Sequence, residues 1–247
     1  MIDPVCDSEV NCFGAYLTTF VGSTEVNLVD DVNRLATASV RRSGAVTDGA
    51  TLLLIRVSSN SAVSFSIKTP SGGSPTANEW GVLTDRHGSS SGSFITIQPE
   101  VTTQGNIAFA AYKTPLNFPG NSNSRMEKIT IEATSSSGNV NTTLDLLRPP
   151  IVLVHGVWSD SGAWQQLDTY LTDRGFTVLR PDYRADSAGS FDPKDVGHPY
   201  LIATVNLATL QARESLRSSG IAVTQVDVVG HSLGGLIARK CCKDAIF

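Results

Sequence analysis

The pattern of apolar residues changes at Pro149 and Pro150, and this change constrains the fold more than any other feature of the chain. Proline lacks a backbone N–H and restricts the residue before it, so a proline pair cannot continue a central strand or a helix. A chain of 247 residues is long enough for two ordinary domains. We therefore expect an N-terminal segment over residues 1–20, a first domain over residues 21–147 and a second over residues 148–247.

Residues 21–147 contain short apolar runs that alternate with polar residues and are separated by clusters of Gly, Ser, Pro and Asn. Alternation with a period of two is typical of strands, and the separators favour turns. Strand-length runs occupy residues 35–44, 50–59, 62–70, 93–101, 106–115 and 128–138. About seven short antiparallel strands predict an all-β sandwich. The stretches "VTDGATLLLIRV" and "ITIEATSSSGNVNTTLDLL" resemble the immunoglobulin-like (Ig-like) modules of bacterial surface and secreted proteins.

Beyond the proline pair, strand-length apolar runs alternate with helical periods. Residues 151–156 form an unbroken apolar run, which is typical of a parallel strand covered on both faces. Trp164, Leu167 and Leu171 share one face of a helix that we expect to end at Gly175. Further strands are expected over 176–184 and 225–232, with a longer helix over 201–220 between them. This alternation predicts a doubly wound, mainly parallel α/β sheet.

The segment Gly230-His231-Ser232-Leu233-Gly234 fits the pattern G-x-S-x-G and falls between an expected strand and an expected helix. Such a turn strains the backbone of the serine, and a side chain at either glycine would crowd the neighbouring strand or helix. Leu233 would open the helix, so its N–H would point toward the serine oxygen from the positive end of the helix dipole. The motif predicts Ser232 as a nucleophile and the Leu233 N–H as an oxyanion donor.

Several motifs of the second half together resemble α/β-hydrolases of the bacterial lipase and esterase type. These motifs are His155-Gly156, Trp164, the segment 181–184 ("PDYR") and "VVGHSLGGLIAR", and the resemblance spans residues 149–247. It implies a serine hydrolase that cleaves carboxylic esters through an acyl-enzyme, without a metal or an organic cofactor. It also implies a second oxyanion donor at the N–H of Val157, elbow support from Gly230, His231, Gly234, His155 and Gly156, and Trp158 as a candidate wall of the substrate pocket.

The position of the histidines departs from this family. The resemblance implies an acid and a histidine after the nucleophile, but His87, His155, His198 and His231 all precede Ser232. We therefore expect the acid and the histidine beyond residue 247, so that this chain holds only the N-terminal part of an incomplete α/β-hydrolase domain and is inactive alone. Two alternatives stay open: a binding or surface module with a vestigial hydrolase half, and an amidase or transacylase on the same fold.

Composition and charge restrict the partners. A net charge of −4 gives no basic surface for nucleic acid. The sequence contains no run of 18 apolar residues, so it predicts no membrane span. An ester or lipid small molecule is the expected substrate, and the oligomeric state is open. The β half fits an exported or surface protein, although no signal peptide is visible at the N-terminus. Cys6 and Cys12 would close a short disulfide loop in an oxidising compartment. Whether they are bridged is not decided by the sequence.

Overall fold

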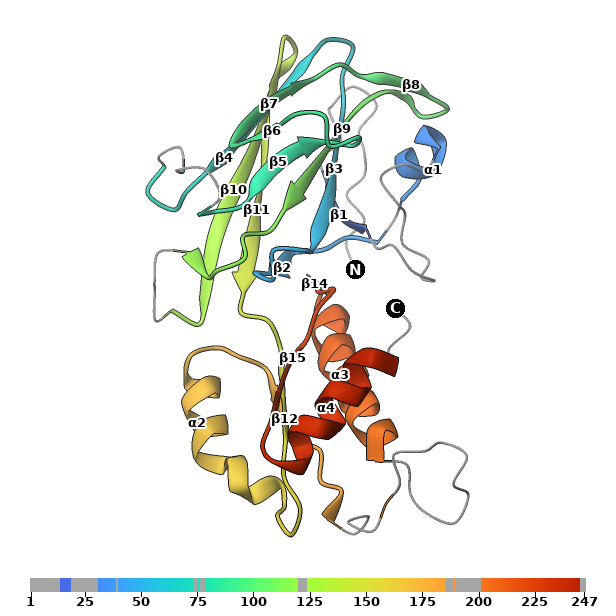
Figure 1. Cartoon of the computed structure of the whole chain (residues 1–247). Coiled ribbons are helices and arrows are strands. Elements are labelled where there is room, and N and C mark those ends of the chain that lie inside the picture. Colours follow the sequence, from blue (N-terminus) through green and yellow to red (C-terminus); the bar gives the residue numbers. More distant parts are fainter. Residues whose placement is uncertain are drawn as a thin grey trace. The chain divides into compact units, whose positions relative to one another are not determined.

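The structure, a computed structural model, describes residues 14–18, 31–38, 40–72, 79–119, 124–184 and 201–244, together with residues 75 and 189. The chain divides into two compact units (Figure 1). The first comprises residues 1–122, 126–147 and 220–222, and the second comprises residues 123–125, 148–219 and 223–247. Cys6, Cys12 and His198 lie outside the described residues, so the expected disulfide stays a prediction.

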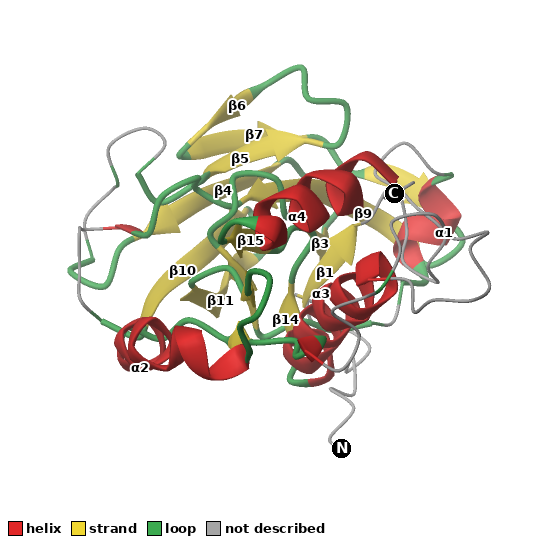
Figure 2. Ribbon diagram, turned by 60° about the horizontal axis from the view of Figure 1, so that its bottom comes forward, coloured by secondary structure: helices red, strands yellow, loops and turns green. Residues whose placement is uncertain are grey.

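The first unit is rich in sheet and contains two sheets (strands in yellow in Figure 2). One sheet is antiparallel throughout, with the order β1-β3-β9-β5-β6 and with β8 also paired to β9. Its strands are β1 (Gly14–Thr18), β3 (Leu52–Ser58), β5 (Val82–Asp85), β6 (Ser91–Gly92), β8 (Glu100–Thr102) and β9 (Gly105–Lys113).

The second sheet of this unit is mixed, which corrects the expectation of a purely antiparallel domain. Its order is β14-β2-β11-β10-β4-β7, and β2 runs parallel to both β11 and β14. No hairpin connects β2 to either neighbour, so no tight turn forces an antiparallel direction. The strands are β2 (Gly44–Val46), β4 (Val63–Lys68), β7 (Phe94–Ile97), β10 (Met126–Ser135), β11 (Gly138–Leu147) and β14 (Ile221–Ala222).

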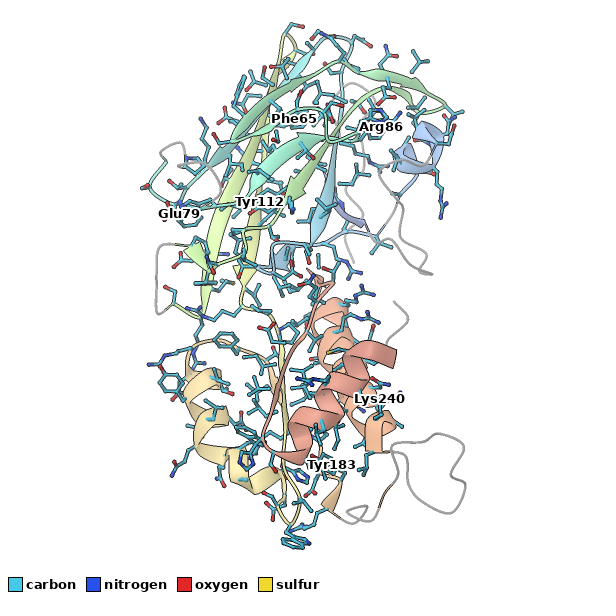
Figure 3. All side chains as sticks on the ribbon, viewed as in Figure 1. Phe65, Glu79, Arg86, Tyr112, Tyr183 and Lys240 are labelled. Atoms are coloured by element: carbon cyan, nitrogen blue, oxygen red, sulfur yellow. The ribbon has the colours of Figure 1, made fainter. Side chains whose placement is uncertain are left out.

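Both sheets contribute to one hydrophobic core. Along β4, Val63, Phe65 and Ile67 are fully buried and alternate with partly exposed serines and a lysine, as a period of two requires. From the other sheet, Tyr112 is also fully buried, and its hydroxyl donates a hydrogen bond to the carbonyl oxygen of Trp80 at 2.7 Å. Phe65 and Tyr112 are labelled in Figure 3. The immunoglobulin-like character of this unit stays a prediction.

The described residues between 35 and 43 do not form the expected strand, and Gly44 is the first residue of β2. The helix α1 (Val32–Ala36) covers the start of this segment, and the side chain of its N-cap residue Asp31 accepts a hydrogen bond from the Asn33 N–H at 2.8 Å. Leu35 and Ala36 are buried in a second cluster with residues of β3 and β9. The N-cap and this burial outweigh the strand-like alternation of the segment. The strand β1 lies in the segment 1–20, where no strand was expected.

One strand of the first unit comes from the C-terminal half of the sequence. In β14, Ile221 is in register with Gly44 of β2, and the N–H of Ser43 donates to the carbonyl oxygen of Gly220 at 2.9 Å. Ala222 is fully buried in the core that both sheets share. The core of the first unit is therefore completed by a residue that lies 75 positions after Leu147, where β11 ends (222 minus 147).

The second unit contains three parallel strands in the order β13-β12-β15, which confirms the parallel strand–helix alternation. These strands are β12 (Ile151–Val154), β13 (Val178–Leu179) and β15 (Asp227–Gly230). The helix α2 (Gln165–Asp173) lies on one side of β12 and β15, and α3 (Leu201–Ser218) and α4 (Leu233–Asp244) lie on the other (Figure 1). A short 3-10 helix, η2 (Ser161–Trp164), leads into α2.

The helix ends and the central strand of this unit follow the sequence. All four residues of β12 are buried, as its unbroken apolar run predicts. Just beyond the ends of α2 and α3, Gly175 and Gly220 have φ values of 84° and 81°, the left-handed conformation that terminates helices. None of the helices in the described ranges is long and apolar enough to cross a membrane.

The buried position of Ala222 gives a test of the strand that completes the first unit. We expect Ala222→Asp to lower the free energy of unfolding of the whole chain by about 3 kcal/mol or more, because it places an unpaired carboxylate in an apolar core. Gln225→Asp, which adds the same charge at an exposed position nearby, should change it by less than about 0.5 kcal/mol. Urea denaturation followed by circular dichroism measures both values, and equal effects would contradict the assignment of β14.

Candidate active site

Ser232 lies in the turn between β15 and α4, at the end of the central parallel sheet of the second unit. Its φ is +54°, a left-handed conformation that costs a non-glycine residue energy. Within the described ranges, Trp158 is the one other non-glycine residue with positive φ, and it follows β12, the strand next to β15. Strained residues of this kind cluster at functional sites. The strained serine turn predicted from the motif is therefore present.

The glycines on either side of Ser232 allow the backbone of α4 to approach the strands closely. A Cβ atom added to Gly234 would lie 2.2 Å from the carbonyl oxygen of Val154 in β12. A Cβ atom added to Gly230 would lie 2.5 Å from the carbonyl oxygen of Gly234. No side chain fits at either distance, which confirms the steric role predicted for both glycines.

The loop after β12 contacts this turn. A Cβ atom added to Gly156 would lie 3.1 Å from Nδ1 of His231 and 3.2 Å from Cβ of Ser232. The backbone N–H of His231 donates to the carbonyl oxygen of Val154 at 3.0 Å and ties the turn to the end of β12. The structure thus brings together His155, Gly156 and the turn at 230–234, as the sequence predicts.

Two backbone N–H groups near Ser232, those of Leu233 and Val157, are candidates for binding an anion. The N–H groups of Gly234 and Gly235 are already engaged, because they donate to the carbonyl oxygens of His231 and Ser232, each at 2.9 Å. Leu233 is the first residue of α4, where N–H groups have no partner inside the helix and the helix dipole is positive. Val157 directly follows Gly156 and is 45% exposed. The N–H groups of Leu233 and Val157 are therefore the candidate donors.

His155 is 98% buried and both of its ring nitrogens have partners. Nδ1 lies 2.9 Å from the carbonyl oxygen of Gly156, and Nε2 accepts a hydrogen bond from the backbone N–H of Tyr183 at 3.3 Å. The Tyr183 ring stacks on the imidazole with centroids 3.9 Å apart, and its hydroxyl donates to the carbonyl oxygen of His155. Tyr183 carries no functional signal in the sequence beyond its place in "PDYR", directly after a strand.

Ion pairs brace the loop after β13. The guanidinium of Arg184 lies 2.7 Å from the Asp160 carboxylate and 3.6 Å from that of Asp182. The backbone N–H of Arg184 donates to Asp182 Oδ1 at 2.9 Å, and this hydrogen bond, aided by the guanidinium charge, lowers the pKa of Asp182. Asp160 also accepts from the Gly162 N–H at 2.7 Å as the N-cap of η2. These contacts brace the loop after β13 and cap the start of η2.

Trp158 and His87 are not held at the turn of Ser232 by contacts like those described above. Trp158 is 94% exposed, so no described residue encloses its ring, and its role as a pocket wall stays a prediction. His87 lies in the first unit, in the turn after β5, where its N–H donates to the Asp85 carboxylate at 3.0 Å. Across the described residues, no group of three or more His, Cys, Asp or Glu side chains could hold a metal ion.

The profile of the alpha/beta hydrolase family matches residues 151–246, which include β12, the turn at Ser232 and α4. The match supports a hydrolase-type α/β fold for this part of the chain. No curated protein matches the chain. One solved structure, a family 123 glycoside hydrolase from Clostridium perfringens described for glycolipid glycan hydrolysis, is 13% identical with a TM-score of 0.21. The matched region covers 63% of this chain and 32% of the glycoside hydrolase chain.

The contacts at Gly234 predict a sharp difference between two adjacent glycines. Gly234→Ala should lower the free energy of unfolding by more than about 2 kcal/mol, because the added methyl group would push α4 away from β12. Gly235→Ala should leave it unchanged or raise it by up to about 1 kcal/mol, since the nearest atom would lie 3.7 Å away and alanine favours a helix. Chemical denaturation of the two variants measures this difference, and equal stability would contradict the close approach.

The depressed pKa of Asp182 predicts a contribution to stability that depends on pH. A carboxyl with a lower pKa in the folded state stabilises the fold above its unfolded pKa of about 3.9, and this stabilisation is lost as pH falls through the folded pKa. Asp182→Asn should therefore reduce stability at pH 6 but make little difference at the acidic end of the titration. Thermal unfolding of both proteins between pH 2.5 and 6 tests this, and a difference independent of pH would contradict it.

Proposed function

We propose that this chain carries the nucleophile and the oxyanion hole of a serine hydrolase of the lipase or carboxylesterase type, which cleaves carboxylic esters. The observation that carries the proposal is the conformation of Ser232, held at a φ of +54° between β15 and α4 with the loop at Gly156 against it. A strained serine at a strand-to-helix turn presents its hydroxyl at the edge of the sheet. The match of residues 151–246 to the alpha/beta hydrolase family supports the same chemistry.

In the proposed reaction, Ser232 Oγ attacks the ester carbonyl and its proton passes to a histidine base. The carbonyl oxygen becomes an oxyanion, which the N–H groups of Val157 and Leu233 stabilise by about 3 kcal/mol each. As this intermediate collapses, the C–O bond of the ester breaks, the protonated histidine gives its proton to the departing oxygen, and the alcohol leaves Ser232 acylated. Water activated by the same base then releases the carboxylic acid and restores the hydroxyl.

We place the base of this reaction outside the described residues. His155 is unsuited because it is buried and both ring nitrogens are engaged, by Gly156 and by Tyr183. No described residue, His87 included, forms a hydrogen bond with Ser232 Oγ. We propose that a histidine and an acid from outside the described part complete the site, and that without them acylation of Ser232 is slow.

Exposed apolar residues near the turn support a substrate with an apolar acyl group. Val157 is 45% exposed, Trp158 is 94% exposed, and Leu236, on the first turn of α4, is 58% exposed. Apolar side chains that remain exposed beside a candidate site are typical of contact with an apolar ligand. We therefore propose an ester or lipid as the substrate class, with Trp158 contacting the acyl chain.

The experiment uses a fluorophosphonate, which forms a covalent bond with activated serines. We expect slow phosphonylation of Ser232, read by intact-mass and peptide mass spectrometry over hours, and none in Ser232→Ala. Ser64→Ala is the matched control, since this serine lies on β4 of the other unit and should leave labelling unchanged. Labelling that persists in Ser232→Ala, or a wild-type chain that does not react, would contradict the nucleophile assignment.

Turnover of paired p-nitrophenyl ester and anilide substrates separates esters from amides. Because the base and the acid are absent from the described residues, we expect only slow release of p-nitrophenol as Ser232 is acylated by the ester, no release in Ser232→Ala, and at most trace cleavage of the anilide. Labelling at Ser232 together with preferred anilide cleavage would instead favour the amidase alternative.

A further inference from the structure

We propose that Tyr183 is a positioning residue that holds the oxyanion loop in place through His155. The inference rests on the proposed function, because it concerns the direction in which the Val157 N–H points. Tyr183 follows β13 and His155 follows β12, so the contact joins the loops of two neighbouring parallel strands. Tyr183 is labelled in Figure 3, and both residues are 98% buried.

The hydrogen-bond partners of the imidazole determine which of its nitrogens donates and which accepts. The backbone N–H of Tyr183 can only donate, so Nε2 of His155, 3.3 Å away, must accept and carries no proton. The neutral ring then carries its proton on Nδ1, which donates to the carbonyl oxygen of Gly156 at 2.9 Å. The two hydrogen bonds therefore select one tautomer of His155.

The hydrogen bond to Gly156 also orients the peptide plane between Gly156 and Val157. The carbonyl of Gly156 and the N–H of Val157 belong to one peptide unit, which is planar, and the described residues contain no cis peptide bond. In a trans unit these two groups point in opposite directions. A hydrogen bond that fixes the Gly156 carbonyl toward His155 thereby directs the Val157 N–H away from His155.

The side chain of Tyr183 keeps the imidazole itself in place. The Tyr183 ring stacks on it with an angle of 14° between the planes, and the Tyr183 hydroxyl donates to the carbonyl oxygen of His155. Burial and the nearby Asp182 carboxylate raise the pKa of Tyr183 to about 12, so the hydroxyl remains a donor across the pH range of ester hydrolysis. The backbone and the side chain of Tyr183 together thus hold the ring and the carbonyl group of His155.

A competing partner for Nε2 lies nearby and is otherwise occupied. Asp182 Oδ1 is 3.6 Å from Nε2, beyond a good hydrogen bond, and would attract a proton onto that nitrogen. The same oxygen accepts from the Arg184 N–H, and the Arg184 guanidinium lies 3.6 Å from the other carboxylate oxygen. These contacts engage the Asp182 carboxylate, so Nε2 of His155 remains the acceptor of the Tyr183 N–H.

The experiment measures the tautomer of His155 and the reactivity of Ser232 separately, both on the whole chain. Long-range nitrogen–proton NMR spectra of protein labelled with ¹⁵N-histidine distinguish Nδ1–H from Nε2–H without any catalysis. Phosphonylation of Ser232 by a fluorophosphonate gives a rate constant by mass spectrometry. Tyr183→Phe removes only the hydroxyl, Tyr183→Leu also removes the stacked ring, and Tyr170→Phe is the control, because Tyr170 lies half-exposed on α2.

We expect His155 in the wild type to be Nδ1–H and to remain so in Tyr183→Phe, while Tyr183→Leu loses the single tautomer. The rate of phosphonylation should fall about tenfold in Tyr183→Phe, the factor that one hydrogen bond is worth, fall further in Tyr183→Leu, and stay unchanged in Tyr170→Phe. Thermal unfolding should show all variants folded at the assay temperature.

Two outcomes would overturn the inference, and they are distinguishable from each other. If the wild type reacts at Ser232 but Tyr183→Phe reacts equally fast, or His155 is found as Nε2–H, the positioning role is wrong and the hydrolase proposal stands. If the wild type shows the Nδ1–H tautomer but Ser232 does not react, the proposed function is wrong and the contact with Tyr183 only stabilises the fold.

Discussion

The second unit depends on a backbone-to-backbone contact between α4 and the strands beside it. At Gly234 the helix lies so close to Val154 that there is no room for even one methyl group. The contact between strand and helix at Gly230 leaves no room for one either. This approach gives α4 its direction, and the direction places the first N–H groups of the helix beside Ser232. The strained conformation of the serine is the cost of joining strand and helix within two residues. Reactivity at this point would therefore follow from packing, before any catalytic base is considered.

The parts of the fold that the sequence predicted are those set by neighbouring residues. The strand β12 follows from its unbroken apolar run, and α2 and α3 end where Gly175 and Gly220 allow a left-handed turn. The turn at Ser232 was predictable because the glycines that it needs lie within two residues of the serine. Alternation along β4 likewise indicates which of its residues face the core of the first unit. Each of these patterns is local, so no knowledge of the tertiary structure was needed.

The features that were missed depend on distant partners. Residues 35–44 alternate like a strand, but Leu35 belongs to a helix because Asp31 caps it and residues of β3 and β9 bury it. Two residues of β14 carry no strand signal of their own, and their partner β2 lies 177 positions earlier (221 minus 44). Tyr183 was overlooked for a similar reason, since its importance comes from His155, 28 residues before it in the sequence. The expected role of Trp158 depends on a pocket that the described residues do not enclose.

The late strand β14 has a consequence for how the protein is made. A ribosome releases the chain from the N-terminus, so β2 and most of the first core emerge while Ile221 and Ala222 are still to be synthesised. During that interval the backbone N–H of Ser43 has no Gly220 carbonyl to bind, and the space that Ala222 fills is open. Translation speed over the segment between β11 and β14 would then set how long a growing chain exposes this edge, and with it the exposure of nascent chains to chaperones.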